Sequence, residues 1–134
     1  MGVLVDTSVW VDVERGRLTP AAVEAALGAE LVFATPVTLA ELGYGVRRAK
    51  TREQRATRRA ALERVATKDC LVIDAETAEV FGTVASDLDA RGRPSTHRVQ
   101  DLCIASLALQ HGHKVLTRNR RDFDDIPGLT VLSI

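Results

Sequence analysis

The chain contains 134 residues, of which 46% are hydrophobic, and its 18 basic residues balance its 18 acidic residues. This length predicts a single domain over residues 1–134, and the composition is that of an ordinary globular protein, which excludes a disordered or membrane-spanning chain. No apolar run approaches the ~20 residues of a transmembrane helix and the start lacks a signal-peptide pattern, so we expect a cytoplasmic protein without membrane contact. Cys70 and Cys103 lie in apolar segments and are expected to be reduced core residues.

The first half of the chain alternates short aliphatic runs with helix-like segments. In order, the pattern predicts a strand at 3–5, helices at 8–14 and 19–28, a strand at 31–35, a helix starting at residue 36 and a helix at 51–66. Thr19 and Pro20 carry the N-cap and first-turn signature of a helix start. After the second strand, Leu39, Leu42 and Val46 recur at helical spacing.

The second half of the chain continues this alternation. It predicts a strand at 70–73, a helix at 74–90, a polar loop at 90–98, a helix at 99–111, and strands at 115–117 and 129–133. Asp74 is the expected cap of the first of these helices, and Gly112 is the expected end of the second. Aliphatic strands separated by helices predict an α/β fold with a central parallel sheet of four to five strands and helices on both faces.

Four acidic residues lie where a parallel sheet presents its ligand sites. Open α/β sheets bind ligands at the carboxyl ends of their strands. Asp6 ends the first strand, and Glu41 lies early in the helix after the second strand. Asp101 lies in the first turns of an otherwise apolar helix, and Asp122 follows the fourth strand. We therefore expect the four carboxylates to gather at one edge of the sheet.

Taken singly, each of these acids also has a structural explanation. Asp6 and Asp101 could cap helices. Glu41 could be a solvated residue paired with Arg48 or a neighbour, and Asp122 could bond local amides. Together, however, carboxylates in one cleft repel each other, and a divalent cation would compensate their charge. Oxygen ligands without histidine or cysteine at metal spacing favour Mg²⁺, with Mn²⁺ able to substitute, and such an ion activates water for phosphodiester hydrolysis.

Four segments of the chain resemble, in order and spacing, the motifs of a known family. They are VLVDTSVW at 3–10, the glutamate of TLAEL at 38–42, VQDLCIASLA at 99–108 and LTRNRRDF at 116–123. The family is that of the PIN-domain ribonucleases and, more narrowly, the VapC toxins of bacterial VapBC toxin–antitoxin modules. The resemblance implies a PIN-like fold, a toxic Mg²⁺-dependent endoribonuclease acting on RNA, a homodimer, and a cognate VapB antitoxin whose C-terminal tail blocks the acidic pocket.

The resemblance also assigns roles to individual residues. The implied catalytic and metal-binding acids are Asp6, Glu41, Asp101 and Asp122. Asp6 and Asp101 would be the principal ligands, and Glu41 would contribute directly or through water. The fourth acid is open, because Asn119 stands where many members carry aspartate, which leaves Asp122 or, as a second candidate, Asp124. The residues expected to orient substrate or water by hydrogen bonds are Thr7, Ser8, Thr117 and Asn119.

The basic segment from Arg47 to Arg59 has two interpretations. It contains seven arginine and lysine residues and one acid, Glu53. Clustered positive charge supplies sequence-independent affinity for RNA phosphates. The same pattern is typical of a solvated helix face, and it would also suit a surface that contacts the antitoxin.

Two other function classes share some of these features. An aspartyl-phosphate phosphatase uses an aspartate after the first strand as its nucleophile, but its DxDxT pattern needs an acid where this chain has Ser8. A receiver-like signalling or binding module needs paired acids after the first strand and a phospho-accepting aspartate after a central strand. The segment CLVIDAET offers only Asp74 for that role.

Overall fold

A five-stranded parallel sheet forms the centre of the protein, which a computed structural model describes over all 134 residues. The strand order is β3-β2-β1-β4-β5, and all four pairings are parallel. The strands are β1 (Gly2–Val5), β2 (Leu31–Ala34), β3 (Asp69–Cys70), β4 (Lys114–Thr117) and β5 (Val131–Ser133). The predicted α/β class and strand number are confirmed. The chain order changes direction beside β1, where parallel sheets place their ligand sites.

The helices begin and end close to the predicted residues. They are α1 (Thr7–Glu14), α2 (Pro20–Leu27), α3 (Pro36–Arg47), α4 (Arg52–Ala66), α5 (Ala75–Ala90), α6 (Val99–His111) and the short 3₁₀ helix η1 (Arg120–Asp122). The Thr19 side chain accepts a hydrogen bond from the Ala22 amide, and Asp74 forms a capping box with Thr77. Gly112 ends α6 at φ 69°, in the left-handed region that glycine adopts readily. None of these helices has the length and hydropathy needed to span a membrane.

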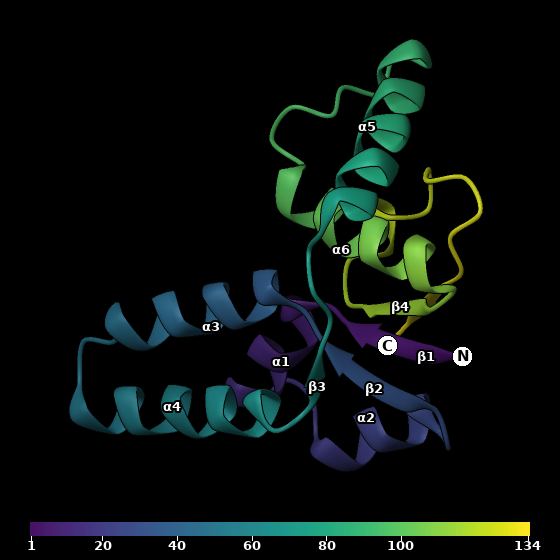
Figure 1. Ribbon diagram of the computed structural model, residues 1–134. Coiled ribbons are helices and arrows are strands. Elements are labelled where there is room, and N and C mark those ends of the chain that lie inside the picture. The colour runs from purple at the N-terminus through teal and green to yellow at the C-terminus, as the bar shows by residue number, and fades with distance from the viewer.

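Two helical layers cover the sheet, as Figure 1 shows, with α5 and α6 on one side and α2 on the other. Successive side chains of a strand point to opposite faces, so β1 contributes to both layers. Leu4 packs in the cluster that contains the buried residues of α5 and α6. Val3 and Val5 pack on the opposite face with Val9 of α1 and Val23 of α2. These two apolar clusters fix where the end of β1 lies.

The helices α3 and α4 form an antiparallel pair that extends away from the sheet (Figure 1). A smaller cluster of Ala34, Leu42 and Val65 anchors this pair at the end of β2. The predicted basic segment 47–59 covers the end of α3, the turn and the first half of α4. Most of its side chains are exposed, as expected for a helix with little apolar surface.

The third strand is shorter than predicted. It contains Asp69 and Cys70, which pair with Phe33 and Ala34 at the edge of the sheet, in place of four residues. The chain then leaves the sheet toward α5, and Val72 and Ile73 are 70% and 45% exposed. The aliphatic run 70–73 suggests a strand buried on both faces, which is wrong here because β3 is an edge strand that the helical layers do not cover.

The two cysteines also differ from the prediction. Both are free thiols, but Cys70 is exposed on β3 and Cys103 is half-buried on α6. The prediction that both lie in the core is therefore wrong. Apolar neighbours in the sequence do not bury a residue at a sheet edge.

Candidate active site

The four predicted acids line one pocket at the carboxyl end of the sheet. The pocket has a volume of about 390 Å³, and Asp6, Glu41, Asp101 and Asp122 all face it. They come from four different parts of the chain: the turn after β1, then α3, α6 and η1. Thr7, Ser8 and Asn119 line the same pocket, whereas Thr117 contributes through a hydrogen bond.

Asp6 is held by the two neighbouring strands β1 and β4. Its amide donates to the carbonyl of Leu116 at 2.8 Å. Its Oδ2 accepts hydrogen bonds from Ser8 Oγ at 2.7 Å and Thr117 Oγ1 at 2.9 Å. Burial raises the pKa of this carboxyl, and the two hydroxyl donors oppose that rise. Asp6 occupies the N-cap position of α1 without a side-chain cap bond, so the capping explanation for this residue is wrong.

Glu41 is oriented by hydroxyl groups. Thr7 Oγ1 lies 3.0 Å from Glu41 Oε1 and 3.0 Å from Thr38 Oγ1. Glu41 forms no ion pair with Arg48. Burial raises the pKa of Glu41, the hydrogen bond from Thr7 opposes this, and the charge of Asp6 adds to the rise. The hydroxyl of Thr7 therefore orients the carboxylate of Glu41, which lies on α3.

Asp101 lies in the first turn of α6, and the apolar core fixes the rotation of this helix. Leu102, Ile104 and Leu107 of α6 are at most 1% exposed. Arg98 occupies the N-cap, so Asp101 is not the cap that the structural explanation proposed. Burial raises the pKa of Asp101 to about 6, with further contributions from the charges of Asp6, Asp122 and Glu41. The smaller contributions to this rise in pKa come from the other carboxylates, which repel the Asp101 charge across the pocket.

Of the two candidates for the fourth predicted acid, Asp122 lines the pocket and Asp124 does not. Asp124 lines a separate cavity beside Arg91 and Arg93. The backbone at Asp122 is held by Arg98, whose Nη2 donates to the Asp122 carbonyl at 2.7 Å. Asn119 faces the acidic pocket, and its backbone amide donates a hydrogen bond to Thr117 Oγ1 at 2.9 Å.

Three arginines that the sequence interpretation missed stand at the rim of this pocket: Arg15, Arg17 and Arg118. Arg118 binds Asp12 at 2.8 Å and the carbonyl of Ile134 at 2.7 Å. Arg17 lies 3.6 Å from the same aspartate. An acidic floor with a basic rim suits a substrate that carries phosphate. Arg118 could have been identified from the sequence, because it lies in the same segment, 116–123, as Asp122.

The donor set fits a hard divalent cation. It consists of carboxylate oxygens, the pKa values of Asp6, Glu41 and Asp101 are raised, and a cation would relieve the repulsion between the carboxylates. No three acidic, histidine or cysteine side chains are close enough together to form a complete protein cage for an ion. Mg²⁺ does not require such a cage, because it usually keeps several waters and binds one or two carboxylates together with substrate phosphate.

Comparison with known proteins places these features in a family. The PIN domain family matches residues 3–129. Ribonuclease VapC5 of Mycobacterium tuberculosis is 38% identical over 133 residues, which is 99% of this chain and 93% of the relative. Ribonuclease VapC of Rickettsia bellii is 31% identical over 135 residues, which is 100% of this chain and 97% of the relative.

A solved structure gives the same result. The crystal structure of VapBC-5, a member of the VapBC family of toxin–antitoxin systems from Mycobacterium tuberculosis, superimposes with a TM-score of 0.81 at 34% identity. The match covers 99% of this chain and 98% of the other. The resemblance inferred from the four motifs is confirmed, and the phosphatase and receiver alternatives are wrong. The chain belongs to the PIN domain family and, within it, to the VapC ribonucleases.

Proposed function

We propose that this protein is the toxin of a toxin–antitoxin module, an Mg²⁺-dependent endoribonuclease that hydrolyses RNA phosphodiester bonds. The supporting observation is the convergence of four carboxylates on one pocket in a chain whose relatives are named ribonuclease VapC. Asp6 and Asp101 would hold Mg²⁺, or Mn²⁺ in its place, and Glu41 and Asp122 would contribute directly or through water.

The surrounding residues prepare these acids for that role. A bound divalent ion lowers the pKa of a water molecule and polarises a phosphate. Ser8 and Thr117 fix one oxygen of Asp6, and Thr7 fixes one oxygen of Glu41, so neither carboxylate is free to rotate. A carboxylate that is left without a metal contact can accept a proton from the attacking water.

The proposal includes protein partners. VapBC-5, which this chain resembles at 34% identity, is a member of the VapBC family of toxin–antitoxin systems. We extend this to a cognate VapB-type antitoxin that binds and neutralises the present chain, and to a homodimer of the chain. The proposal places both proteins in the cytoplasm, where RNA is present.

RNA cleavage by the purified protein tests the proposal. We expect Mg²⁺ or Mn²⁺ to support cleavage of single-stranded RNA and EDTA to abolish it. Asp6→Asn, Asp101→Asn and Asp122→Asn should each reduce the rate at least about 100-fold, because each removes a charge from the site. Asp124→Asn is the matched control and should cleave normally, since this residue faces another cavity. Cleavage by Asp101→Asn at the rate of the unmodified protein would refute the proposed metal site.

A further inference from the structure

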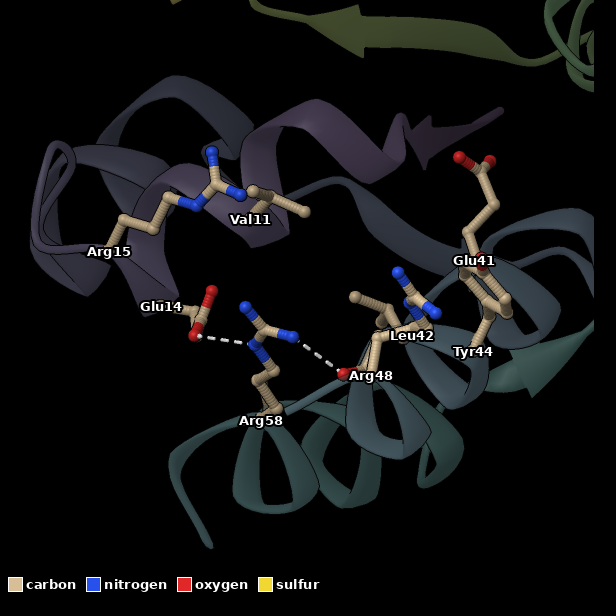
Figure 2. Close-up of a pocket in the computed structure, with 10 residues that line it drawn as sticks. Val11, Glu14, Arg15, Glu41, Leu42, Tyr44, Arg48 and Arg58 are labelled. Carbon is tan, nitrogen blue, oxygen red and sulfur yellow. Dashed lines mark hydrogen bonds and ion pairs between the residues drawn. The ribbon is translucent and has the colours of Figure 1, made fainter. Parts of the chain in front are cut away.

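A second cavity opens beside the acidic pocket, between α1, α3 and α4 (Figure 2). Its volume is about 380 Å³, which lies within the range of small-molecule sites, about 300–1,000 Å³. Val11, Arg15 and Glu41 line both cavities, so the two lie side by side. A chain molecule whose phosphate lies at the acids would therefore place its neighbouring unit in this second cavity.

The cavity presents two arginines that no protein group neutralises. Arg58 is occupied, because it lies 3.6 Å from Glu14 and donates to the Gly45 carbonyl at 2.7 Å, as the dashed lines of Figure 2 show. Arg15 and Arg48 are exposed and have no side-chain hydrogen bond or ion pair with the rest of the chain. Arg15 comes from the α1 side of the cavity and Arg48 from the α3 side (Figure 2). Two unpaired guanidinium groups facing one cavity favour an anionic ligand.

The cavity also has an exposed aromatic ring. Tyr44 is the only tyrosine of the chain, and it is 67% exposed. It lies on α3 near Glu41, and Leu42 and Ala61 supply apolar wall beside it. An exposed ring next to positive charge is the arrangement with which proteins bind single-stranded nucleic acid, because bases stack on the ring and phosphates pair with the arginines.

We propose that this second cavity is a subsite for the RNA nucleotide adjacent to the bond that is cut. The base stacks on Tyr44, and Arg15 and Arg48 bind the flanking phosphate. This assignment rests on the proposed ribonuclease function, since the adjacency of the two cavities at Glu41 matters only if the scissile phosphate lies at the acids. Stacking accepts every base, so the subsite contributes affinity and position along the strand more than base identity.

Binding of a short single-stranded RNA to the Asp101→Asn protein tests the subsite without cleavage. A fluorescein-labelled oligonucleotide of about ten residues gives Kd by fluorescence anisotropy. Tyr44→Ala in this background should weaken binding about 10-fold, whereas Tyr44→Phe, which keeps the ring, should bind as the background does. Unchanged thermal unfolding midpoints of these variants would show that the exposed position leaves the fold intact.

The charge contribution has its own matched pair of variants. Arg48→Gln should reduce the slope of log Kd against log salt concentration by about 0.7, the value for one phosphate contact on a single strand. Arg47→Gln is the control, because Arg47 is the exposed neighbour of Arg48 and does not line the cavity. We expect its salt slope to match that of the background protein within the error of the titration.

The outcomes separate the subsite from the function on which it rests. If the unmodified protein cleaves RNA but Tyr44→Ala and Arg48→Gln bind and cleave normally, the subsite is wrong and the ribonuclease proposal stands. If these variants lose only the affinity for the antitoxin, the cavity is a protein contact and the subsite is again wrong. Loss of RNA affinity in Tyr44→Ala, retained in Tyr44→Phe, supports the subsite even if the cleavage assay fails. Absence of any RNA binding refutes both.

Discussion

The hydroxyl of Thr117 donates a 2.9 Å hydrogen bond to Oδ2 of Asp6 and so joins the end of β4 to the end of β1. The two residues are 111 positions apart in the chain. Thr117 is fully buried, and its Oγ1 also accepts a hydrogen bond from the backbone amide of Asn119. One side chain therefore connects the acid of the first strand to the loop that leads to Asp122.

Thr117→Val should impair the site while leaving the sheet in place, because valine has nearly the same shape. The variant loses the hydrogen bond to Asp6 and leaves the backbone amide of Asn119 without its acceptor. We therefore expect the free energy of unfolding to fall by about 1–2 kcal/mol. RNA cleavage should fall about 10-fold, since Asp6 keeps only the bond from Ser8. Urea unfolding and initial cleavage rates measure the two effects. Wild-type cleavage by this variant would show that Ser8 alone positions Asp6.

Asp101→Asn should stabilise the metal-free protein at neutral pH. The pKa of Asp101 is raised from 3.8 to about 6, so between pH 4 and 6 the folded state holds a proton that the unfolded state has lost. This group therefore lowers the unfolding free energy as pH rises through that window, and its full cost is present above pH 6. Allowing for solvent screening at this half-buried position, we expect a gain of about 1 kcal/mol. Urea unfolding in EDTA at pH 8 and pH 4 should show the gain only at pH 8.

RNA cleavage at low Mg²⁺ should fall as the pH drops through about 6. Metal binding requires the ionised carboxylate, and Asp101 becomes protonated below its raised pKa of about 6. Because Mg²⁺ competes with the proton, a higher Mg²⁺ concentration should move the midpoint to lower pH. Rate–pH profiles at two Mg²⁺ concentrations measure this shift. A midpoint that does not depend on Mg²⁺ would contradict the assignment of Asp101 as a ligand.

Arg98→Gln should loosen the segment that carries Asp122. Arg98 binds Asp125 through two hydrogen bonds of 2.8 and 2.9 Å and also donates to the Asp122 carbonyl. Removing this half-buried guanidinium should cost about 2 kcal/mol of unfolding free energy. Its positive charge lowers the pKa of Asp101, so the pH midpoint of cleavage should also rise. Arg121→Gln is the control, because this exposed arginine of η1 has no such partner.

Much of the fold could be predicted because its signals are local. Thr19, Asp74 and Gly112 mark helix ends through bonds and backbone angles within a few residues of themselves. The convergence of the acids could be predicted as well, since parallel strands bring their carboxyl ends to one edge whatever the details of packing.

The remaining features depend on distant parts of the chain. Cys70 and Val72 are exposed because β3 lies at the edge of the sheet, and a run of apolar residues carries no information about its place in the strand order. The choice between Asp122 and Asp124 depends on the turn of η1 and on Arg98, which is 24 positions away from the carbonyl it holds. The second cavity could not be predicted from the sequence either, because it is formed by the packing of α1 against α3 and α4.

The extension of the α3–α4 pair away from the sheet divides the molecule into two parts with different tolerance to change (Figure 1). Asp101 is carried by a helix whose next turns are the hydrophobic core, so substitutions of those core residues disturb chemistry and folding together. Tyr44 and Arg48 are exposed on the outer pair, where replacements leave the core untouched. Selection can therefore alter what the outer pair contacts while the acids stay in place, so related chains can diverge in their targets and keep one mechanism.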